Sequence, residues 1–279
     1  MSVNGHADDR RPGPPRGRSS RVTVIADEPS GVSTNPSNDH RAPATGASLR
    51  RGPLLAVCGL CGGAGASTLA YLTALAAARS ERGDVLLADT GGPTGGLSHY
   101  TGVGTPRSLS EVAELLAAGL PVGQLLATTS ERVRVLATGP RFATDCAREG
   151  VELLLDHARR RYTLTVVDCG TLACQADQLA LASASHVAWV LPGSAGAVDR
   201  GRKTLDALAS HPSGREMLIA RHDPSDPRTA IRALRDLARE RRAPLILMPT
   251  LLQLATANTR GALEAAQVPL QAILGALAR

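Results

Sequence analysis

The sequence predicts an α/β protein with a doubly wound, mostly parallel sheet of about seven strands. From Pro53 onward, short apolar runs rich in Val, Leu and Ile alternate with longer segments that have the composition of helices. Continuous apolar runs are typical of strands that are covered on both faces. Strict alternation of such strands with helices indicates parallel strands joined by crossover connections.

Each element follows from a local pattern. The expected strands are Leu54–Cys58, Val85–Asp89, Val133–Ala137, Thr163–Asp168, His186–Leu191, Glu216–Ala220 and Leu245–Met248. The helices expected between them are Ser67–Arg79, Leu109–Ala118, Ala147–Arg160, Gln175–Ser183, Ala195–Ala209 and Arg228–Arg241. Ser108 and Glu111 have the spacing of a capping box at the start of the second helix. Two further segments, Leu251–Asn258 and Ala262–Ala278, close the chain.

The chain divides into an N-terminal arm, residues 1–50, and a domain, residues 51–279. The arm is rich in Pro, Gly, Ser, Asn and Arg and has no aromatic residue, so we expect it to be disordered. Within it, Arg21–Ile25 alternates like a strand. This patch is either a fluctuating segment or a peptide that adds to the sheet edge of a partner.

The amino-acid composition limits the classes of function that this protein can have. The net charge of +6 permits weak contact with nucleic acid or an anionic membrane, and almost all basic residues are arginines, Lys203 being the only lysine. Aromatic residues are too scarce for a base-stacking surface. No apolar run approaches the roughly 20 residues of a membrane span, and the N-terminus lacks an apolar signal segment, so we expect a cytoplasmic protein with reduced cysteines.

The stretch Leu54–Ala70 indicates a phosphate-binding cradle. An apolar strand is followed by the turn Gly62-Gly63-Ala64-Gly65, and Ser67-Thr68 then opens a helix. Glycines let the backbone approach an anion closely, and the first N–H groups of a helix point toward it.

This stretch resembles the deviant phosphate loop of the MinD/ParA ATPases, whose pattern is K-G-G-x-G-K-[ST]-[ST]. The matching residues are Cys61, Gly62, Gly63, Ala64, Gly65, Ala66, Ser67 and Thr68. The glycines and hydroxyls fit the pattern, but cysteine and alanine replace both lysines. The variant of the loop and the order of the later segments resemble the CpaE/TadZ branch and related septum-site proteins, which implies a P-loop fold and a positioning role.

Three later stretches fit the same resemblance. Asp89 matches the first acid of the family's D-x-D-P motif, whereas Gly91 replaces the second acid, which positions the attacking water in relatives. Asp168 matches the Walker B acid that holds Mg²⁺ through water, with Ser67 as the other expected Mg²⁺ contact. Ala220 replaces an asparagine that reads adenine, and Pro249 fits the turn of the base pocket.

The missing lysines predict a pseudo-ATPase. Each charge-assisted hydrogen bond to phosphate is worth about 1.5–3 kcal/mol, so the loss of two weakens ATP binding roughly a hundred- to ten-thousand-fold. Hydrolysis suffers more, because phosphoryl transfer depends on placed cations. Two alternatives stay open: a tightly packed glycine turn without a ligand, and a working ATPase that takes an arginine from elsewhere, with Arg141 and Arg221 as candidates.

We therefore expect a positioning or scaffold protein of a secretion, pilus, division or partition machine. It would act as a homodimer with a partner from that machine, and would bind ATP and Mg²⁺ weakly or not at all. A non-specific DNA-binding module is a further alternative. Its basis is two basic clusters, Arg200, Arg202 and Lys203 in one, and Arg232, Arg235, Arg239, Arg241 and Arg242 in the other.

Two other patterns favour structural roles. Cys58 and Cys61 form a C-x-x-C pair, and Cys169 and Cys174 follow a later strand, so four thiols could meet at a zinc or iron–sulfur site. Since Cys58 lies in an apolar strand, we expect it to pack as a small hydrophobe. The last segment, Pro269–Arg279, lacks the basic face of a membrane-surface helix, so packing on the domain is expected over peripheral membrane contact.

Overall fold

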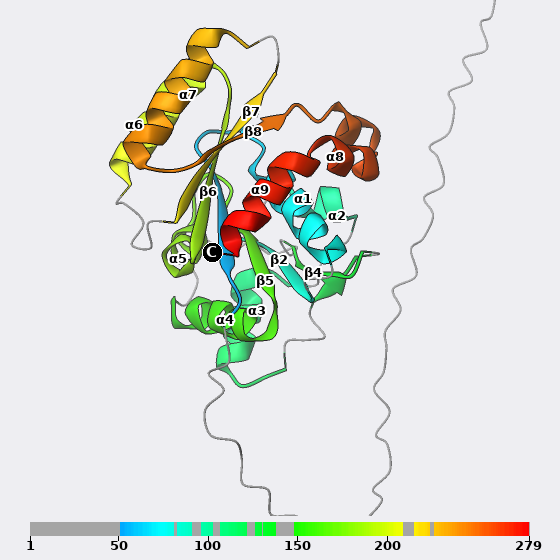
Figure 1. Ribbon diagram of the computed structural model, residues 1–279. Coiled ribbons are helices and arrows are strands. Elements are labelled where there is room, and N and C mark those ends of the chain that lie inside the picture. Colours follow the sequence, from blue (N-terminus) through cyan, green and yellow to red (C-terminus); the bar gives the residue numbers. More distant parts are fainter. Residues whose placement is uncertain are drawn as a thin grey trace, which may run out of the picture. The chain divides into compact units, whose positions relative to one another are not determined.

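The structure is a computed structural model (Figure 1). It describes residues 51–80, 83–90, 96–102, 107–121, 126–129, 131–137, 148–208, 215–223 and 226–278. These residues belong to one compact unit, Ser48–Arg279. The arm predicted for residues 1–50, together with its Arg21–Ile25 patch, lies outside the described residues, as do Gly91 and Arg141.

A mostly parallel sheet forms the centre of the domain, as predicted. Its strands have the order β3-β4-β2-β5-β1-β6-β7-β8. Their bounds are β1 Leu54–Gly59, β2 Val85–Asp89, β3 Ala127–Thr128, β4 Val133–Leu136, β5 Leu164–Asp168, β6 His186–Pro192, β7 Glu216–His222 and β8 Leu245–Pro249. The expected strands are confirmed to within two residues at each end. The edge strand β3 was not predicted; it is two residues long and pairs antiparallel with β4.

Helices fill the connections between the strands, as the alternating pattern predicted. Their bounds are α1 Ala66–Arg79, α2 Leu97–Thr101, α3 Leu109–Ala117, α4 Arg148–Arg161, α5 Gln175–Ser183, α6 Ala195–Ala207 and α7 Arg228–Arg241, followed by the 3₁₀ helix η2 Leu252–Thr256, α8 Thr259–Ala265 and α9 Gln267–Leu277. The short helix α2 was not predicted.

The closing segment differs from the single run expected for Ala262–Ala278. It breaks at Ala266, which ends α8 and precedes α9. Pro269 explains the position of the break, because a proline has no N–H to donate and is tolerated in the first turn of a helix but not in its interior. Packing of the segment on the domain is confirmed, since Leu270, Ile273 and Leu274 are buried against the face that α1 covers.

The two faces of the sheet carry separate cores. Along β1, Leu55 and Val57 pack with residues of α1, α8 and α9, whereas Leu54, Ala56 and Cys58 pack with residues of α3 to α7. This alternation follows from the two-residue period of a strand. Figure 1 shows α9 in red beside α1 in cyan, while α6 and α7 lie together on the other side of the sheet's far strands. The domain therefore has three layers.

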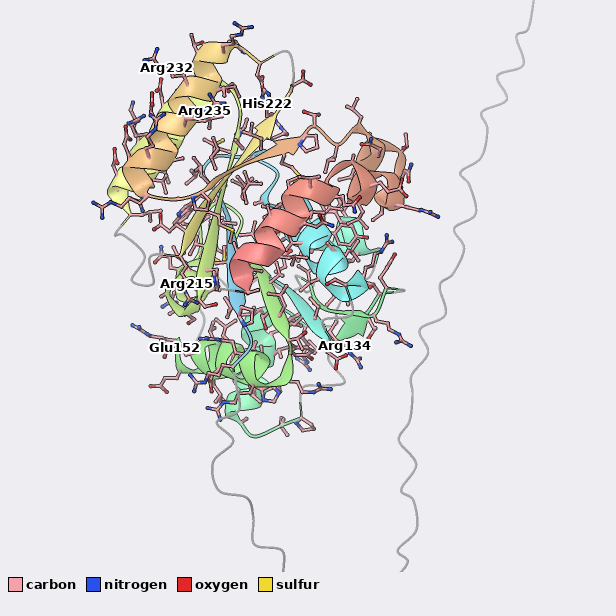
Figure 2. The ribbon with its side chains drawn as sticks, viewed as in Figure 1. Arg134, Glu152, Arg215, His222, Arg232 and Arg235 are labelled. Atoms are coloured by element: carbon pink, nitrogen blue, oxygen red, sulfur yellow. The ribbon has the colours of Figure 1, made fainter. Side chains whose placement is uncertain are left out.

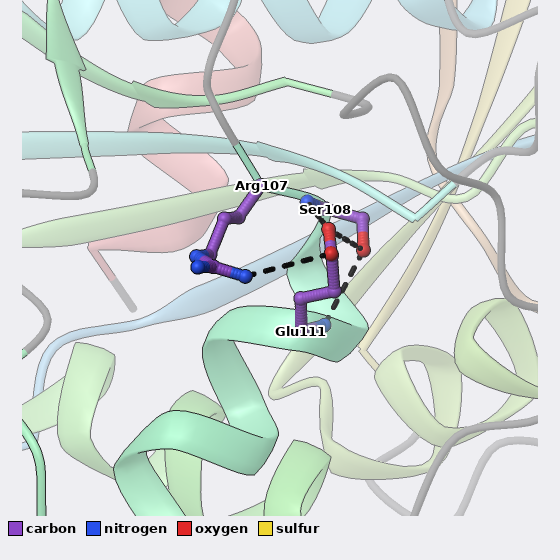
Figure 3. A network of polar contacts seen from close by, with 3 residues as sticks. All are labelled: Arg107, Ser108 and Glu111. Carbon is purple, nitrogen blue, oxygen red and sulfur yellow. Dashed lines mark hydrogen bonds and ion pairs between the residues drawn. The ribbon is translucent and has the colours of Figure 1, made fainter.

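The capping box is present at the start of α3 (Figure 3). The backbone N–H of Ser108 donates to Glu111 Oε2 at 2.8 Å, and the N–H of Glu111 donates to Ser108 Oγ at 3.3 Å. Arg107 adds an ion pair to Glu111 at 3.7 Å. No helix among the described residues is long and apolar enough to cross a membrane.

Candidate phosphate site

The glycine turn joins the end of β1 to the start of α1. Gly63 and Gly65 have φ angles of 70° and 100°, in the left-handed region that glycine adopts without steric cost. The carboxyl end of β1 is held from both flanks: the N–H of Gly59 donates to the carbonyl of Gly170 at 2.6 Å, and that of Leu60 to the carbonyl of Val190 at 2.8 Å. The turn is therefore a fixed loop on a rigid strand.

Unused donors line this turn. Within the described residues, the N–H groups of Gly62, Gly63, Gly65 and Ala66 donate to no protein acceptor. A Cβ atom built on Gly62, Gly63 or Gly65 meets no described atom within 4 Å, so the turn faces open space. Converging N–H groups at a helix N-terminus attract anions.

The carboxyl ends of β5 and β2 place one acid beside the turn and a second acid one strand farther away. Asp89 ends β2 and Asp168 ends β5, and they are register partners. Each is 2 % exposed. Burial raises the pKa of Asp168, and the hydrogen bonds from the Ser67 side chain and the Gly170 N–H oppose this rise. The N–H of Gly170 donates to Asp168 Oδ1 at 3.1 Å.

The donor set suits a hard divalent cation. A carboxylate and a hydroxyl are oxygen ligands, and Mg²⁺ is usually bound by one or two carboxylates together with waters and substrate phosphates. Ser67 and Asp168 already lie within hydrogen-bond reach of each other. These two residues could therefore hold Mg²⁺ next to phosphates in the turn.

Helix α2 contacts the turn from the side, which sequence reasoning missed. Thr68 Oγ1 donates to the Tyr100 hydroxyl at 2.8 Å, and the Tyr100 ring stacks on Tyr71 with centroids 5.8 Å apart. A Cβ on Gly96 would lie 3.0 Å from the side chain of Ser67, so a larger residue there would have to push Ser67 aside. No sequence motif marks Gly96 or Tyr100; they come close to the turn because α2 packs against α1.

The proposed base-pocket residues lie at the same edge of the sheet but farther away. Pro249 ends β8 and pairs in register with His222 of β7. Since β6 and β7 separate β8 from β1, Pro249 is about 14 Å from the turn at the usual strand spacing. Ala220, where relatives have an adenine-reading asparagine, is fully buried. The structure thus brings Cys61–Thr68 together with Asp168, places Asp89 next to Asp168 on the following strand, and leaves Pro249 apart.

One arginine reaches the turn. Arg221 Nη1, from the end of β7, donates to the carbonyl of Gly63 at 3.4 Å. The sequence analysis named Arg221 as one of two candidate arginines, together with Arg141, and could not choose between them because the order of the strands in the sheet was unknown.

The cysteines do not form a metal cluster among the described residues. Cys58 and Cys169 are buried side by side, and their mutual hydrogen bond is the main cause that raises the pKa of Cys169, followed by burial. Cys174 donates from Sγ to the carbonyl of Thr90 at 3.3 Å, and burial raises its pKa to about 11. The raised pKa values of Cys169 and Cys174 keep these two thiols protonated at neutral pH, so they pack rather than react.

Comparison with solved structures shows the same fold. A ParA family ATPase from Chlorobium tepidum matches with a TM-score of 0.66 and 17% identity, over 78% of this chain and 92% of that one. The MinC:MinD cell division complex of Aquifex aeolicus matches with a TM-score of 0.62 and 16% identity, over 80% of this chain and 96% of that one. Cobyrinic acid a,c-diamide synthase of Mycobacterium smegmatis, with bound ADP and magnesium, matches with a TM-score of 0.57 and 18% identity, over 78% of this chain and 94% of that one. No protein-family model and no curated protein matches the sequence.

Proposed function

We propose that this protein is a positioning or scaffold protein with a degenerate nucleotide site, which binds MgATP weakly and hydrolyses it slowly or not at all. The observation that carries the proposal is the glycine turn itself. It keeps free N–H donors, open space and the Ser67–Asp168 pair, while Cys61 and Ala66 stand where a lysine would bring charge.

The solved structures support this role by their fold. A ParA family ATPase and a MinD cell division protein share the three layers, and that MinD is bound to MinC. A homodimer with a protein partner fits the same comparison. The loop variant resembles that of the CpaE/TadZ branch, which would make a pilus, secretion or division machine the setting.

The proposed loss concerns one step, the transfer of the phosphoryl group. The turn's N–H groups would bind phosphate oxygens, and Ser67 with Asp168 would hold Mg²⁺, whose chemistry is to offset phosphate charge. Cys61 and Ala66 add no positive charge where phosphoryl transfer needs it. Ground-state binding therefore survives in weakened form, and transition-state stabilisation is removed.

Calorimetric titration with MgATP tests the proposal. We expect saturable binding with a Kd of about 1 mM, which corresponds to roughly −4 kcal/mol, and no measurable phosphate release. Ser67→Ala, which removes the hydroxyl that meets Asp168, should weaken binding only in the presence of Mg²⁺. A Kd tighter than about 10 μM with steady turnover would establish a working ATPase instead.

The positioning role needs a test of its own. A fluorescent fusion of the full chain in its native cell should gather at one or a few sites, and uniform fluorescence would contradict the role. Sedimentation at increasing protein concentration should show a dimer. A monomer at every concentration, with and without MgATP, would exclude the homodimer.

A second function, sequence-independent DNA binding, has one specific observation in its favour. Arg228, Arg232, Arg235, Arg239 and Arg242 recur at steps of four and three residues, and all are exposed. They form an arginine row along the solvent side of α7, with a step of about 5 Å (Figure 2 labels Arg232 and Arg235). Such a row fits a line of phosphates.

Salt-dependent retention of duplex DNA tests this second function. Replacing Arg228, Arg232 and Arg235 by alanine should lower the slope of log K against log salt by about 0.9 for each phosphate that is no longer neutralised. The matched control replaces three exposed arginines that pair with carboxylates, Arg148, Arg160 and Arg260. Equal slopes for both triple variants would exclude α7 as a DNA-binding element.

A further inference from the structure

We propose that Arg221 is the cation of the glycine turn: its guanidinium, reaching from the end of β7, binds the phosphate chain of a nucleoside triphosphate held at Gly62–Gly65. This inference rests on the proposed function and names the residue that replaces the missing lysine charge. It begins from the contact of Arg221 Nη1 with the Gly63 carbonyl at 3.4 Å.

The backbone of Arg221 is fixed by the sheet. Arg221 pairs in register with Pro192 of β6 and Met248 of β8, and its carbonyl accepts the N–H of Gly193 at 2.6 Å. A Cβ on Gly193 would lie 2.7 Å from that carbonyl oxygen, so only glycine permits this close approach. The side chain therefore starts from a rigid strand end and extends past the end of β6 to the turn.

The charge of Arg221 has no carboxylate partner among the described residues. Several arginines of the neighbouring helices do have one: Arg202 pairs with Glu240, Arg239 with Asp236 and Arg241 with Glu216. The adjacent acid Asp226 is engaged elsewhere, because it accepts the N–H of Asp223 at 2.8 Å and contacts His222 Nδ1 at 3.1 Å. The guanidinium thus brings net positive charge to the turn.

The hydrogen bond between Arg221 and the Gly63 carbonyl is easily exchanged. At 3.4 Å it is longer than the 2.7–3.2 Å of a normal N–H···O hydrogen bond, and Arg221 is exposed. A neutral carbonyl is also a weaker acceptor than a phosphate oxygen, to which arginine can donate two parallel hydrogen bonds. A phosphate bound by the N–H groups of the turn would lie next to this guanidinium, and binding would replace the carbonyl acceptor with a charged one.

The same geometry predicts which part of the ligand Arg221 contacts. Its contact is with the glycine turn, where the phosphates would bind, and not with Pro249 at the far end of the edge. The guanidinium should therefore contribute to binding of ATP and of inorganic tripolyphosphate. It should contribute little to binding of adenosine.

The experiment compares Arg221→Gln with Arg134→Gln in the full chain. Both remove one exposed arginine, and Arg134 lies on β4, which β2 and β5 separate from β1 and its turn. We expect Arg221→Gln to weaken MgATP and tripolyphosphate binding by about 10- to 100-fold, as for one charge-assisted hydrogen bond, and to leave adenosine binding unchanged. Arg134→Gln should match the wild type, and Arg221→Lys should recover part of the loss. Thermal unfolding of each variant without ligand checks its fold.

Each outcome separates the two proposals. If the wild type binds MgATP and Arg221→Gln binds it equally well, Arg221 has no role at the turn while the proposed function stands. If Arg221→Gln and Arg134→Gln weaken MgATP binding equally, the effect is one of net charge and the specific contact is refuted. If the wild type shows no saturable binding of MgATP or tripolyphosphate, the nucleotide site and the role of Arg221 fail together.

Discussion

The side chain of Ser67, in the first turn of α1, is hydrogen-bonded to the carboxyl of Asp168, the last residue of β5. These residues come from separate crossover units and meet because β1 and β5 are neighbours in the sheet. The carboxyl is almost completely buried, so burial is the largest cause that raises its pKa. The hydrogen bonds from Ser67 and Gly170 favour the charged form but do not fully offset the effect of burial.

Asp168→Asn should therefore stabilise the protein at neutral pH. A carboxyl whose pKa is higher folded than unfolded binds more protons in the folded state, so its ionisation lowers the free energy of unfolding as pH rises. The gain from asparagine should be largest at high pH and should shrink as the pH falls through the folded pKa of Asp168 toward its unfolded value of about 4, because the carboxyl itself then takes up a proton. Thermal unfolding of both proteins across this range measures it, at about 2–4 °C per kcal/mol.

The matched control for this change is Asp156→Asn. Asp156 is partly exposed and pairs with Arg51 and Arg160, so its removal should not raise the unfolding temperature at any pH. A lower unfolding temperature for Asp168→Asn at pH 7 would show that the carboxylate is stabilised by its surroundings.

Restoring charge to the turn should strengthen nucleotide binding. Cys61→Lys and Ala66→Lys each introduce one lysine of the family pattern, and each should tighten MgATP binding by roughly tenfold or more, because one charge-assisted hydrogen bond is regained. Ala265→Lys on α8, which is exposed and outside the site, adds the same charge and should have no such effect. Unchanged affinity in both loop variants would mean that the turn does not admit a phosphate.

The capping box of α3 should contribute measurably to stability. Ser108→Ala removes the acceptor for the Glu111 N–H and should cost about 1 kcal/mol, or roughly 2–4 °C in unfolding temperature. Ser194, at the N-cap of α6, makes no capping hydrogen bond through its side chain, so Ser194→Ala is the control and should be close to neutral. Equal losses in the two variants would argue against the capping role.

Packing of α9 predicts a large difference between two residues of the same helix. Ile273 is 0 % exposed and Val268 is 76 % exposed. Ile273→Ala should lower the free energy of unfolding by about 2–5 kcal/mol, whereas Val268→Ala should change it by less than about 0.5 kcal/mol. Chemical denaturation measures both, and a small effect at Ile273 would indicate that α9 detaches readily from the sheet.

The sequence predicted most of the fold because buried parallel strands leave continuous apolar runs that are hard to mistake. It missed β3, because a strand of two residues, Ala127 and Thr128, is too short to show an alternating pattern of apolar and polar residues. It also missed the break at Ala266, although Pro269 was visible. The loop was predicted from its glycines, and the acids Asp89 and Asp168 from their match to the motifs of the family that the sequence resembles.

The contacts around the loop depended on information that no local pattern holds. Tyr100 meets Thr68 because α2 packs against α1, and Arg221 meets Gly63 because β6 alone separates β7 from β1. Both are consequences of how the chain is routed through the sheet. A motif names the residues of one segment, whereas a site also needs residues that other strands bring to it.

The place of β1 in the strand order has one more consequence. From β1 the chain runs through α1 to β2, on one side of β1, and it later runs from β5 through α5 to β6, on the other side. Helices α1 and α5 pack on opposite faces of the sheet, so these two connections diverge at the carboxyl end of β1. In open α/β sheets, such a topological switch point leaves a crevice at the carboxyl ends of the strands. Because a crevice of this kind follows from connectivity and not from side chains, replacing a lysine would change the affinity for an anion there without removing the place where the anion would bind.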